Sequence, residues 1–277
     1  SSIFFSKFSY QKLLIVVLLC LCPIRPIQGQ IKNKVVNGWI FEDFEKDLKQ
    51  MQRILSSLLE DSNGFIWMGS LNGVNVYDGK NYKFYKDFLN ENLGFKGMRV
   101  NHIFEDSKGR ILVGTENSGI NLFIPETGGF RNYKDKLFEG TESDFIANIS
   151  ENNKGELFVA SDVIIKFQLN DEGAIINREI YQLNLEQGET IKHGLVYNDR
   201  YFIVTNKRII DYDTRSSIYR GQKITKCKVR YGKFWVLDNW SLGALDVETG
   251  KFKFIELDDF DSKHFTTDFD FIMLFLS

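Results

Sequence analysis

The chain of 277 residues carries 35 basic and 37 acidic side chains, for a formal net charge of −2, and its basic residues are not clustered. This balance gives no electrostatic support to a nucleic-acid-binding surface, so we expect no contact with nucleic acid. Three prolines and the lack of a low-complexity tract argue against linkers or disorder. We therefore expect a single domain after the N-terminal segment.

Residues 1–29 have the three-part layout of a secretory signal. Lys7 and Lys12 give a positive start, residues 13–21 form an unbroken apolar run, and a stretch rich in Pro and Gly follows. The apolar run is short for a membrane span, although an uncleaved anchor is the alternative. We expect an exported protein. Removal of the signal leaves Cys227 as the only cysteine, so stability has to come from packing.

The stretch 54–88 contains four short apolar runs separated by turn signals. Asn63-Gly64, Asn72-Gly73 and Asp78-Gly79 mark the turns, and a glycine after Asn predicts a hairpin with positive φ. The sequence predicts four antiparallel strands in a meander. The run from Phe65 to Met68 is apolar without alternation, which predicts a strand covered on both faces by neighbouring sheets.

The same pattern returns along the chain with a period of about 45 residues at first and a shorter one later. Glu60-Asp61 recurs as Glu105-Asp106, and Gly73-Val74-Asn75 recurs as Gly119-Ile120-Asn121. We predict an all-β β-propeller of four-stranded antiparallel blades. The predicted blades span about 54–88, 98–135, 144–183, 191–221 and 224–257. Since most rings carry more blades, we expect these five to be part of an incomplete ring.

Two flanking segments complete the predicted domain, 30–257. Residues 39–46 alternate apolar and charged side chains, and we interpret them as an outer strand that closes the ring. Residues 258–277 end in an apolar run, which we interpret as the truncated start of a further blade. A membrane helix is the alternative for this run, but it is short for one.

Two stretches resemble the two-component regulator propeller repeat. They are residues 59–70, followed by Asn72-Gly73-Val74, and residues 104–115, followed by Gly119-Ile120-Asn121. The resemblance covers about residues 39–257. It implies the N-terminal periplasmic part of a hybrid two-component sensor of the Bacteroidetes type, in which an exported propeller senses glycan fragments and a membrane helix leads to a histidine kinase.

The resemblance therefore implies a periplasmic sensor region of an inner-membrane protein. Its expected partners are an oligosaccharide, the rest of the sensor kinase and a second copy of the chain. The 277 residues contain no kinase motif, so we expect no enzyme activity from this chain. A propeller glycoside hydrolase or lyase and a protein-interaction scaffold are the alternatives that the residues leave open.

Most polar and aromatic residues of the repeats have a structural interpretation. The paired carboxylates lie at strand ends before tight turns, where Asp commonly caps the turn. Trp67 and Trp235 occupy the same position of their repeats, which predicts a core between blades. His102, His193 and His264 lack the spacing of metal ligands, and no nucleophile elbow or phosphate loop is present. We expect no catalytic residue, metal or cofactor.

One set of loop residues is a candidate ligand site. Trp240 lies in the loop 238–241, with an amide and a hydroxyl on either side, and suits stacking on a sugar ring. The alternative is an aromatic side chain folded onto its own blade. Loops between second and third strands share one face of a propeller with the connections between blades. We therefore expect Asn72, Arg99 and Asn117 near the same face.

Overall fold

The computed structural model describes residues 34–36, 39–41, 55–87, 94–141, 143, 145–239 and 241–254. The chain divides into two compact units, Ser1–Lys49 and Gln50–Ser277. In the first unit, β1 (Lys34–Val36) pairs antiparallel with β2 (Trp39–Phe41) in a two-stranded sheet. The predicted ring-closing strand 39–46 contains β2, and its ring-closing role stays a prediction. The predicted signal and the segment 258–277 lie outside the described residues.

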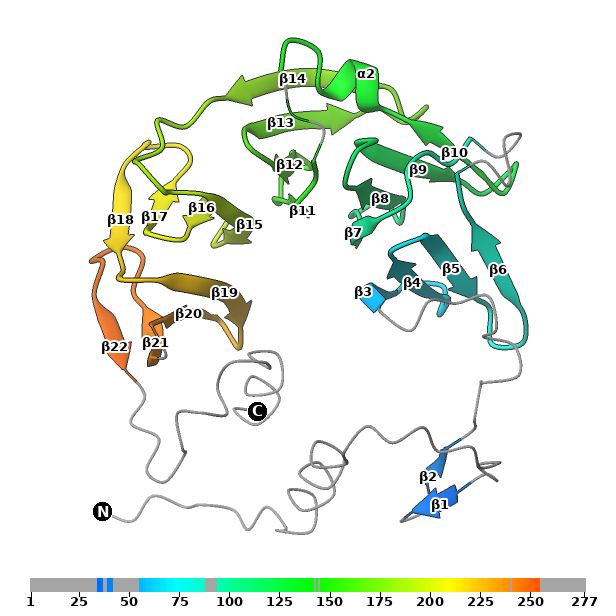
Figure 1. The fold of residues 1–277 in the computed structure, drawn as a ribbon, viewed down its shortest axis with the longest axis horizontal. Coiled ribbons are helices and arrows are strands. Elements are labelled where there is room, and N and C mark those ends of the chain that lie inside the picture. The colour runs from blue at the N-terminus through cyan, green and yellow to red at the C-terminus, as the bar shows by residue number, and fades with distance from the viewer. Residues whose placement is uncertain are drawn as a thin grey trace. The chain divides into compact units, whose positions relative to one another are not determined.

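The second unit contains five four-stranded antiparallel sheets, which confirms the predicted propeller fold. Figure 1 shows them one after another around an arc, with the first strand of each blade innermost and the fourth outermost. Blade one comprises β3 (Leu55–Glu60), β4 (Ile66–Ser70), β5 (Gly73–Tyr77) and β6 (Tyr82–Tyr85); blade two β7 (Val100–Glu105), β8 (Ile111–Thr115), β9 (Ile120–Ile124) and β10 (Gly129–Asn132); blade three β11 (Asn148–Glu151), β12 (Leu157–Ala160), β13 (Ile164–Leu169) and β14 (Ile175–Tyr181); blade four β15 (Ile191–Tyr197), β16 (Arg200–Thr205), β17 (Arg208–Asp211) and β18 (Ser217–Arg220); blade five β19 (Ile224–Arg230), β20 (Lys233–Asp238), β21 (Ser241–Leu245) and β22 (Phe252–Phe254). A short helix, α2 (Lys134–Leu137), follows blade two.

In blades one and two, the turn between the first two strands is built by an aspartate and a glycine. Asp61 Oδ1 accepts the backbone N–H groups of Asn63 and Phe65, both at 2.9 Å, so this carboxylate closes the turn. Asp106 does the same in blade two. Gly64 and Gly109 have φ of 82° and 74°, as predicted, because the chain must reverse there through the left-handed region. The structural interpretation of these aspartates is thus confirmed.

Apolar clusters fill the seams, by which we mean the interfaces between successive blades. Each blade has a rear face toward the preceding blade and a front face toward the following one. The cluster between blades one and two contains Trp67, Val74, Tyr85, Phe95, Val100, Ile103, Ile111, Val113 and Phe130. Similar clusters fill the three later seams. Trp67 is 1% exposed and meets Phe123 edge to face, which confirms its place between blades.

One expectation about burial needs correction. The run Phe65–Met68 is not covered on both faces, since Phe65 is 40% exposed and Met68 is half-buried. The reason is position: no described blade lies behind blade one, whereas the equivalent Leu112 and Val113 of blade two are fully buried. Trp235 is buried as well, and its neighbours along β20 face blade four, so it lies on the front face of blade five. Its place in a core between blades stays a prediction, because the residues after 254 lie outside the described part of the chain.

Polar side chains also join each seam, which sequence reasoning missed. Near the turns, the Glu105 carboxylate accepts the backbone N–H of Ser62 at 2.9 Å and the Ser62 hydroxyl. Glu151 accepts the N–H of Ser107 at 2.6 Å and its hydroxyl at 2.8 Å. A carboxylate of one blade thus holds the turn of the blade before it. Glu105 therefore joins two blades and does not cap its own turn.

A second row of links joins the innermost strands. Ser57 Oγ accepts the N–H of Ile103 at 3.0 Å, and His102 Nδ1 accepts the N–H of Ile149 at 3.2 Å. The Asn148 amide makes two hydrogen bonds with the backbone of blade four, and His193 Nε2 accepts the N–H of Cys227 at 3.2 Å. The inner strands of blades one to four therefore each carry at least one polar side chain that hydrogen-bonds to the backbone of the next blade.

Candidate ligand-binding cavities

A cavity of about 350 Å³ lies where the β4–β5 and β8–β9 turns meet the connection from blade one to blade two. Its lining consists of Leu71, Asp87, Gly97, Met98, Arg99, Glu116 and Asn117. We call it the loop-face cavity. The structure thus brings together Arg99 and Asn117, two of the predicted ligand residues. Asn72 adjoins the lining residue Leu71 but does not line the cavity itself, and Trp240 lies outside the described residues.

The connection between the two blades sets the shape of this cavity. The backbone N–H of Gly97 donates to Asp87 Oδ2 at 2.8 Å, and the N–H of Glu116 donates to the Arg99 carbonyl at 2.9 Å. Gly97 has φ of 91°, and a Cβ there would lie 2.9 Å from the hydroxyl oxygen of Thr115. Glycine is therefore required for the connection to pack against the end of β8.

The polar groups of the loop-face cavity remain accessible. The Arg99 side chain is 52% exposed, and its Nη1 lies 3.4 Å from Glu116 Oε2. Asp87 lies 3.8 Å from Lys96 Nζ, and Lys134 Nζ donates to the Asn117 carbonyl at 2.9 Å. Beside these groups, Met98 is 51% exposed. The cavity offers carboxylates, a guanidinium and an amide next to an apolar surface, a combination that suits hydrogen bonding to a polyol.

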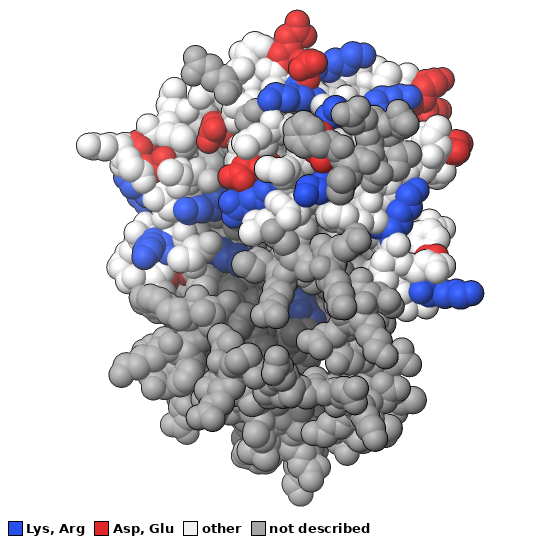
Figure 2. Space-filling view, turned by 45° about the vertical axis from the view of Figure 1, so that its right-hand side comes forward, with Lys and Arg blue, Asp and Glu red and all other residues white. Residues whose placement is uncertain are grey.

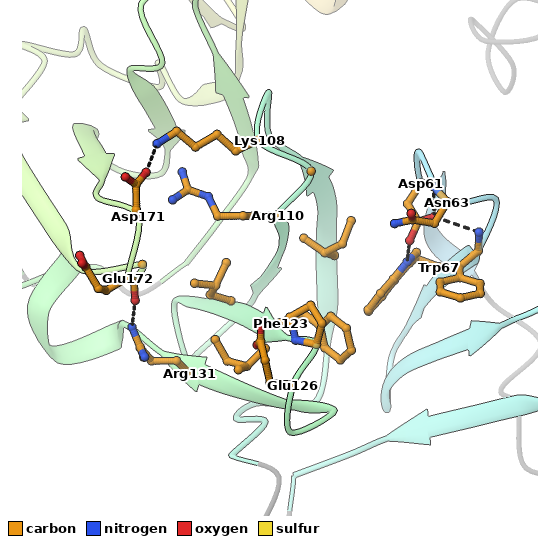
Figure 3. A pocket seen from close by; sticks show the side chains of 17 residues that line it. Asp61, Asn63, Trp67, Lys108, Arg110, Phe123, Glu126, Arg131, Asp171 and Glu172 are labelled. Carbon is orange, nitrogen blue, oxygen red and sulfur yellow. Dashed lines mark hydrogen bonds and ion pairs between the residues drawn. The ribbon is translucent and has the colours of Figure 1, made fainter.

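A larger cavity, of about 470 Å³, lies at the opposite ends of the strands, and we call it the turn-side cavity. Figure 3 shows the ion pair of Lys108 with Asp171 on one side and Trp67 with Asp61 on the other, with Phe123 and Glu126 between them. Blades one, two and three all contribute to its lining. Sequence reasoning missed it because residues from three blades meet there only in the fold.

The charges of the turn-side cavity are largely used to hold turns together. Lys108 Nζ lies 2.6 Å from Asp171 Oδ1, and this hydrogen bond lowers the pKa of the Asp171 carboxyl. Arg110 donates to Asp106 at 2.6 Å and to the Asn170 carbonyl at 2.8 Å. A third cavity, of about 450 Å³, shares Phe65, Trp67 and Phe123 with this one along the outer part of the same seam. We assign the turn-side ion pairs a structural role.

Titratable groups with a strongly shifted pKa lie in the seams and not in the cavities. Burial lowers the pKa of His102 and of His193 from 6.5 to about 4. His102 Nδ1 accepts a backbone N–H, which requires an unprotonated nitrogen, and His193 Nε2 lies 3.2 Å from the backbone nitrogen and 3.1 Å from the carbonyl oxygen of Cys227. Burial also raises the pKa of the Cys227 thiol. These shifts arise from desolvation in packed seams, so they do not mark a reactive centre.

Two features are absent from the described part of the chain. Among its residues, no group of three or more His, Cys, Asp or Glu side chains could hold a metal ion. No helix within the same ranges is long and apolar enough to cross a membrane. Where Figure 2 shows described residues, basic and acidic side chains are interspersed.

Comparisons with known proteins agree with this architecture. A family model described as two component regulator propeller matches residues 47–72 and 94–117. These two stretches are similar to the two-component regulator propeller repeat. Among the described residues, they cover β3 and β4 of blade one and β7 and β8 of blade two. No curated protein sequence matches the chain.

Solved structures support the fold. The extracellular domain of a one-component system from B. thetaiotaomicron matches with a TM-score of 0.54 at 17% identity, over 72% of this chain and 28% of that domain. The WD40 β-propeller domain of Doa1 matches with a TM-score of 0.51 at 14% identity, over 72% of this chain and 67% of that one.

Proposed function

We propose that this chain is the ligand-sensing part of an exported two-component regulator and that it binds an oligosaccharide in the loop-face cavity. Support comes from the repeats and from the propeller fold, which it shares with an extracellular domain of a bacterial signalling system. The chain spans less than a third of that domain, so signalling to a kinase belongs to the proposal. The expected location is the periplasm.

The lining of the loop-face cavity is the observation that supports a carbohydrate as the ligand. Arg99 and Asn117 supply hydrogen-bond donors, Asp87 and Glu116 supply acceptors, and Met98 supplies an exposed apolar surface. A sugar ring has hydroxyl groups that both donate and accept, around a C–H surface that packs on apolar atoms. This mixture favours a neutral carbohydrate over a purely apolar or strongly charged ligand.

We also propose that the cavity binds its ligand without chemistry. Its two carboxylates are already engaged, Glu116 with Arg99 and Asp87 with the backbone of Gly97. A glycoside hydrolase needs one carboxylic acid and one free carboxylate on opposite sides of the scissile bond. Engaged carboxylates suit the recognition of hydroxyl groups better than they suit proton transfer.

Signal transmission would follow from the position of the cavity. The lining comes from blade one, from blade two and from the connection between them, so a bound ligand contacts both blades of one seam. We propose that binding strengthens this seam and that the rest of the sensor, together with a second copy of the chain, responds to that change. The kinase itself lies outside these 277 residues.

The test is calorimetric titration of the full chain against a panel of plant, host and microbial oligosaccharides. We expect Arg99→Ala to weaken the binding of the active glycan by about tenfold or more, as loss of a charged hydrogen bond does. Lys253→Ala, on the outer strand of blade five, is the matched control and should leave the affinity unchanged. A panel without any binder, or equal affinity of Arg99→Ala, would contradict the site. Release of shortened products would overturn the non-catalytic assignment.

A further inference from the structure

In two of the seams, an arginine at the start of the second strand reaches the outer turn of the next blade, which is the turn between its third and fourth strands. Arg110 lies five residues before the end of β8, and its Nη1 donates to the Asn170 carbonyl of blade three at 2.8 Å. Arg200 has the same position relative to the end of β16, and its Nη1 lies 2.6 Å from Glu248 Oε1 of blade five. A guanidinium at this position therefore bridges two successive blades.

The seam between blades one and two has the acceptor of such a bridge but not the arginine. The outer turn of blade two contains Glu126, which is followed by Thr and Gly as Glu248 is in blade five. Five residues before the end of β4, Phe65 stands in the position of Arg200. Among the residues that the structure describes, no group forms a hydrogen bond or an ion pair with the Glu126 carboxylate, and Glu126 is exposed. This carboxylate is therefore accessible to a cation from outside the chain.

The turn-side cavity lies between the two residues that a bridge would join, since both Phe65 and Glu126 line it. An aromatic ring also lies beside the existing bridge, because Arg200 Cζ is 5.2 Å from the centre of the Phe202 ring. Trp67 has the position of Phe202 in its own blade, three residues before the end of the strand, and it lines the cavity as well. The cavity thus repeats a carboxylate and an aromatic ring that surround the Arg200 guanidinium.

The basic side chains of the cavity are engaged on its other side. Each of them holds a turn of blade two or blade three, and Figure 3 shows them across the cavity from Trp67 and Asp61. The contacts are those of Lys108 with Asp171, of Arg110 with Asp106 and of Arg131 with the Glu172 carbonyl. Among the described residues, the part of the cavity from Glu126 to blade one therefore offers aromatic rings and an unpaired carboxylate but no cation.

We propose that the turn-side cavity is a second ligand site, independent of the loop-face cavity, and that it binds a guanidinium group. The guanidinium pairs with Glu126 and stacks on Phe65, which is 40% exposed, or on Phe123, which is half-buried. A planar guanidinium suits this combination, because its edge matches a carboxylate and its face packs on an aromatic ring. The adjoining cavity of about 450 Å³ shares Phe65 and Phe123 with this one and leaves room for the rest of the ligand.

The test is titration of the full chain with Nα-acetyl-argininamide, followed by nuclear magnetic resonance of the Trp67 indole N–H, which the Trp67→Phe variant assigns. We expect a saturable shift with a dissociation constant in the millimolar range, because Val76 stands where Asp211 gives Arg200 a second carboxylate. The citrulline analogue has the same shape without the charge and should bind at least about fivefold more weakly. Lack of a saturable shift, or equal binding of the citrulline analogue, would overturn the proposal.

Methylguanidinium is the second probe, and it distinguishes the sources of the group. Binding of methylguanidinium as tight as that of the argininamide would support the site and assign it to a small free cation. Tighter binding of the argininamide would support the site and assign it to an arginine side chain of a partner, as Arg200 supplies the group within this chain.

Phe65→Arg restores the bridge that the other seams have. By analogy with Arg200, the introduced side chain should pair with Glu126 and occupy the cavity, so the variant should no longer bind the argininamide. Because Phe65 is 40% exposed, this variant should melt within about 2 °C of the parent protein or above it. Glu126→Gln should weaken binding of the probe about fivefold. Glu139→Gln, at an exposed glutamate outside the cavity, is the matched control and should change nothing. Binding by Phe65→Arg or by Glu126→Gln as tight as that of the parent protein would contradict the proposal.

Discussion

Replacement of Trp67 tests the seam between blades one and two most directly. Its side chain is 1% exposed, its ring lies 5.0 Å from that of Phe123, and its Nε1 donates to Asp61 Oδ2 at 2.8 Å. Trp67→Ala removes a large buried aromatic group, which costs roughly 3–5 kcal/mol of unfolding free energy. The loss should be global, because the same side chain joins the core of the seam to the aspartate that builds the turn.

Trp67→Phe separates the two contributions. Phenylalanine retains most of the packing but leaves Asp61 Oδ2 without its indole donor, so we expect a loss of about 1–3 kcal/mol. Urea denaturation of the full chain, followed by near-ultraviolet and far-ultraviolet circular dichroism, measures both variants. An unchanged denaturation midpoint for Trp67→Ala would refute the assignment of Trp67 to the seam. A phenylalanine variant as unstable as the alanine variant would refute the division between packing and hydrogen bonding.

Three further predictions concern turns and links. Gly64→Val should lower the free energy of unfolding by about 1–2 kcal/mol in urea denaturation, because φ at this position is 82°. No atom lies near enough to clash with the new side chain, so the loss would come from the backbone conformation alone. An unchanged denaturation midpoint would contradict the requirement for glycine in this turn. The pKa of the His102 and His193 side chains is about 4 in the folded protein and 6.5 in the unfolded chain. Between these two pH values the unfolded chain therefore binds more protons than the folded protein. The free energy of unfolding should thus fall as the pH drops from about 6.5 toward 4. The loss is about 1–3 kcal/mol per imidazole, since the rings are half-buried, and the double variant with Gln at both positions should lose this part of the pH dependence of the melting temperature. Glu105→Ala should cost about 1–3 kcal/mol by leaving the Ser62 turn without its acceptor, and a double-mutant cycle with Ser62→Ala should show coupling; strict additivity would argue against the link.

Local chemistry explains why the blades could be predicted from the sequence. In blades one and two, the turn glycine and the aspartate at the start of the turn act within five residues, so Asp61 and Gly64 reveal a hairpin without knowledge of the fold. Because the four-strand pattern recurs along the chain, the sequence also predicts that successive blades pack against one another. The same reasoning placed Trp67 in a seam but could not say which blades have a neighbour, and this is why it predicted too much burial for Phe65.

The links between blades could not be predicted in the same way. Glu105 and Ser62 are 43 residues apart, and a glutamate before an aspartate is indistinguishable in sequence from a turn residue. A signal for these links was nevertheless present in the repeats. In three blades a glutamate ends the inner strand, the next residue is the aspartate or asparagine of the turn, and a serine or asparagine follows it. For the ligand site, the propeller topology alone predicted that Arg99 and Asn117 lie near one face, and both line one cavity. The cavity at the opposite ends of the strands could not be predicted, because its lining comes from three blades whose relative positions the sequence does not give.

The seam between blades one and two connects the proposed ligand site to the rest of the molecule. The loop-face cavity lies at one end of this seam, the Trp67 core fills its middle, and the Glu105–Ser62 link closes its other end. A packed core is stiff, so a ligand that contacts both Leu71 in the β4–β5 turn and Asn117 in the β8–β9 turn acts on both blades as bodies and not on one loop. The polar links have fixed directions, which lets them resist sliding between blades better than apolar contacts alone. A sensor built in this way can report occupancy of a surface cavity as a change in seam stability, because binding adds its free energy to the folded arrangement of the two blades.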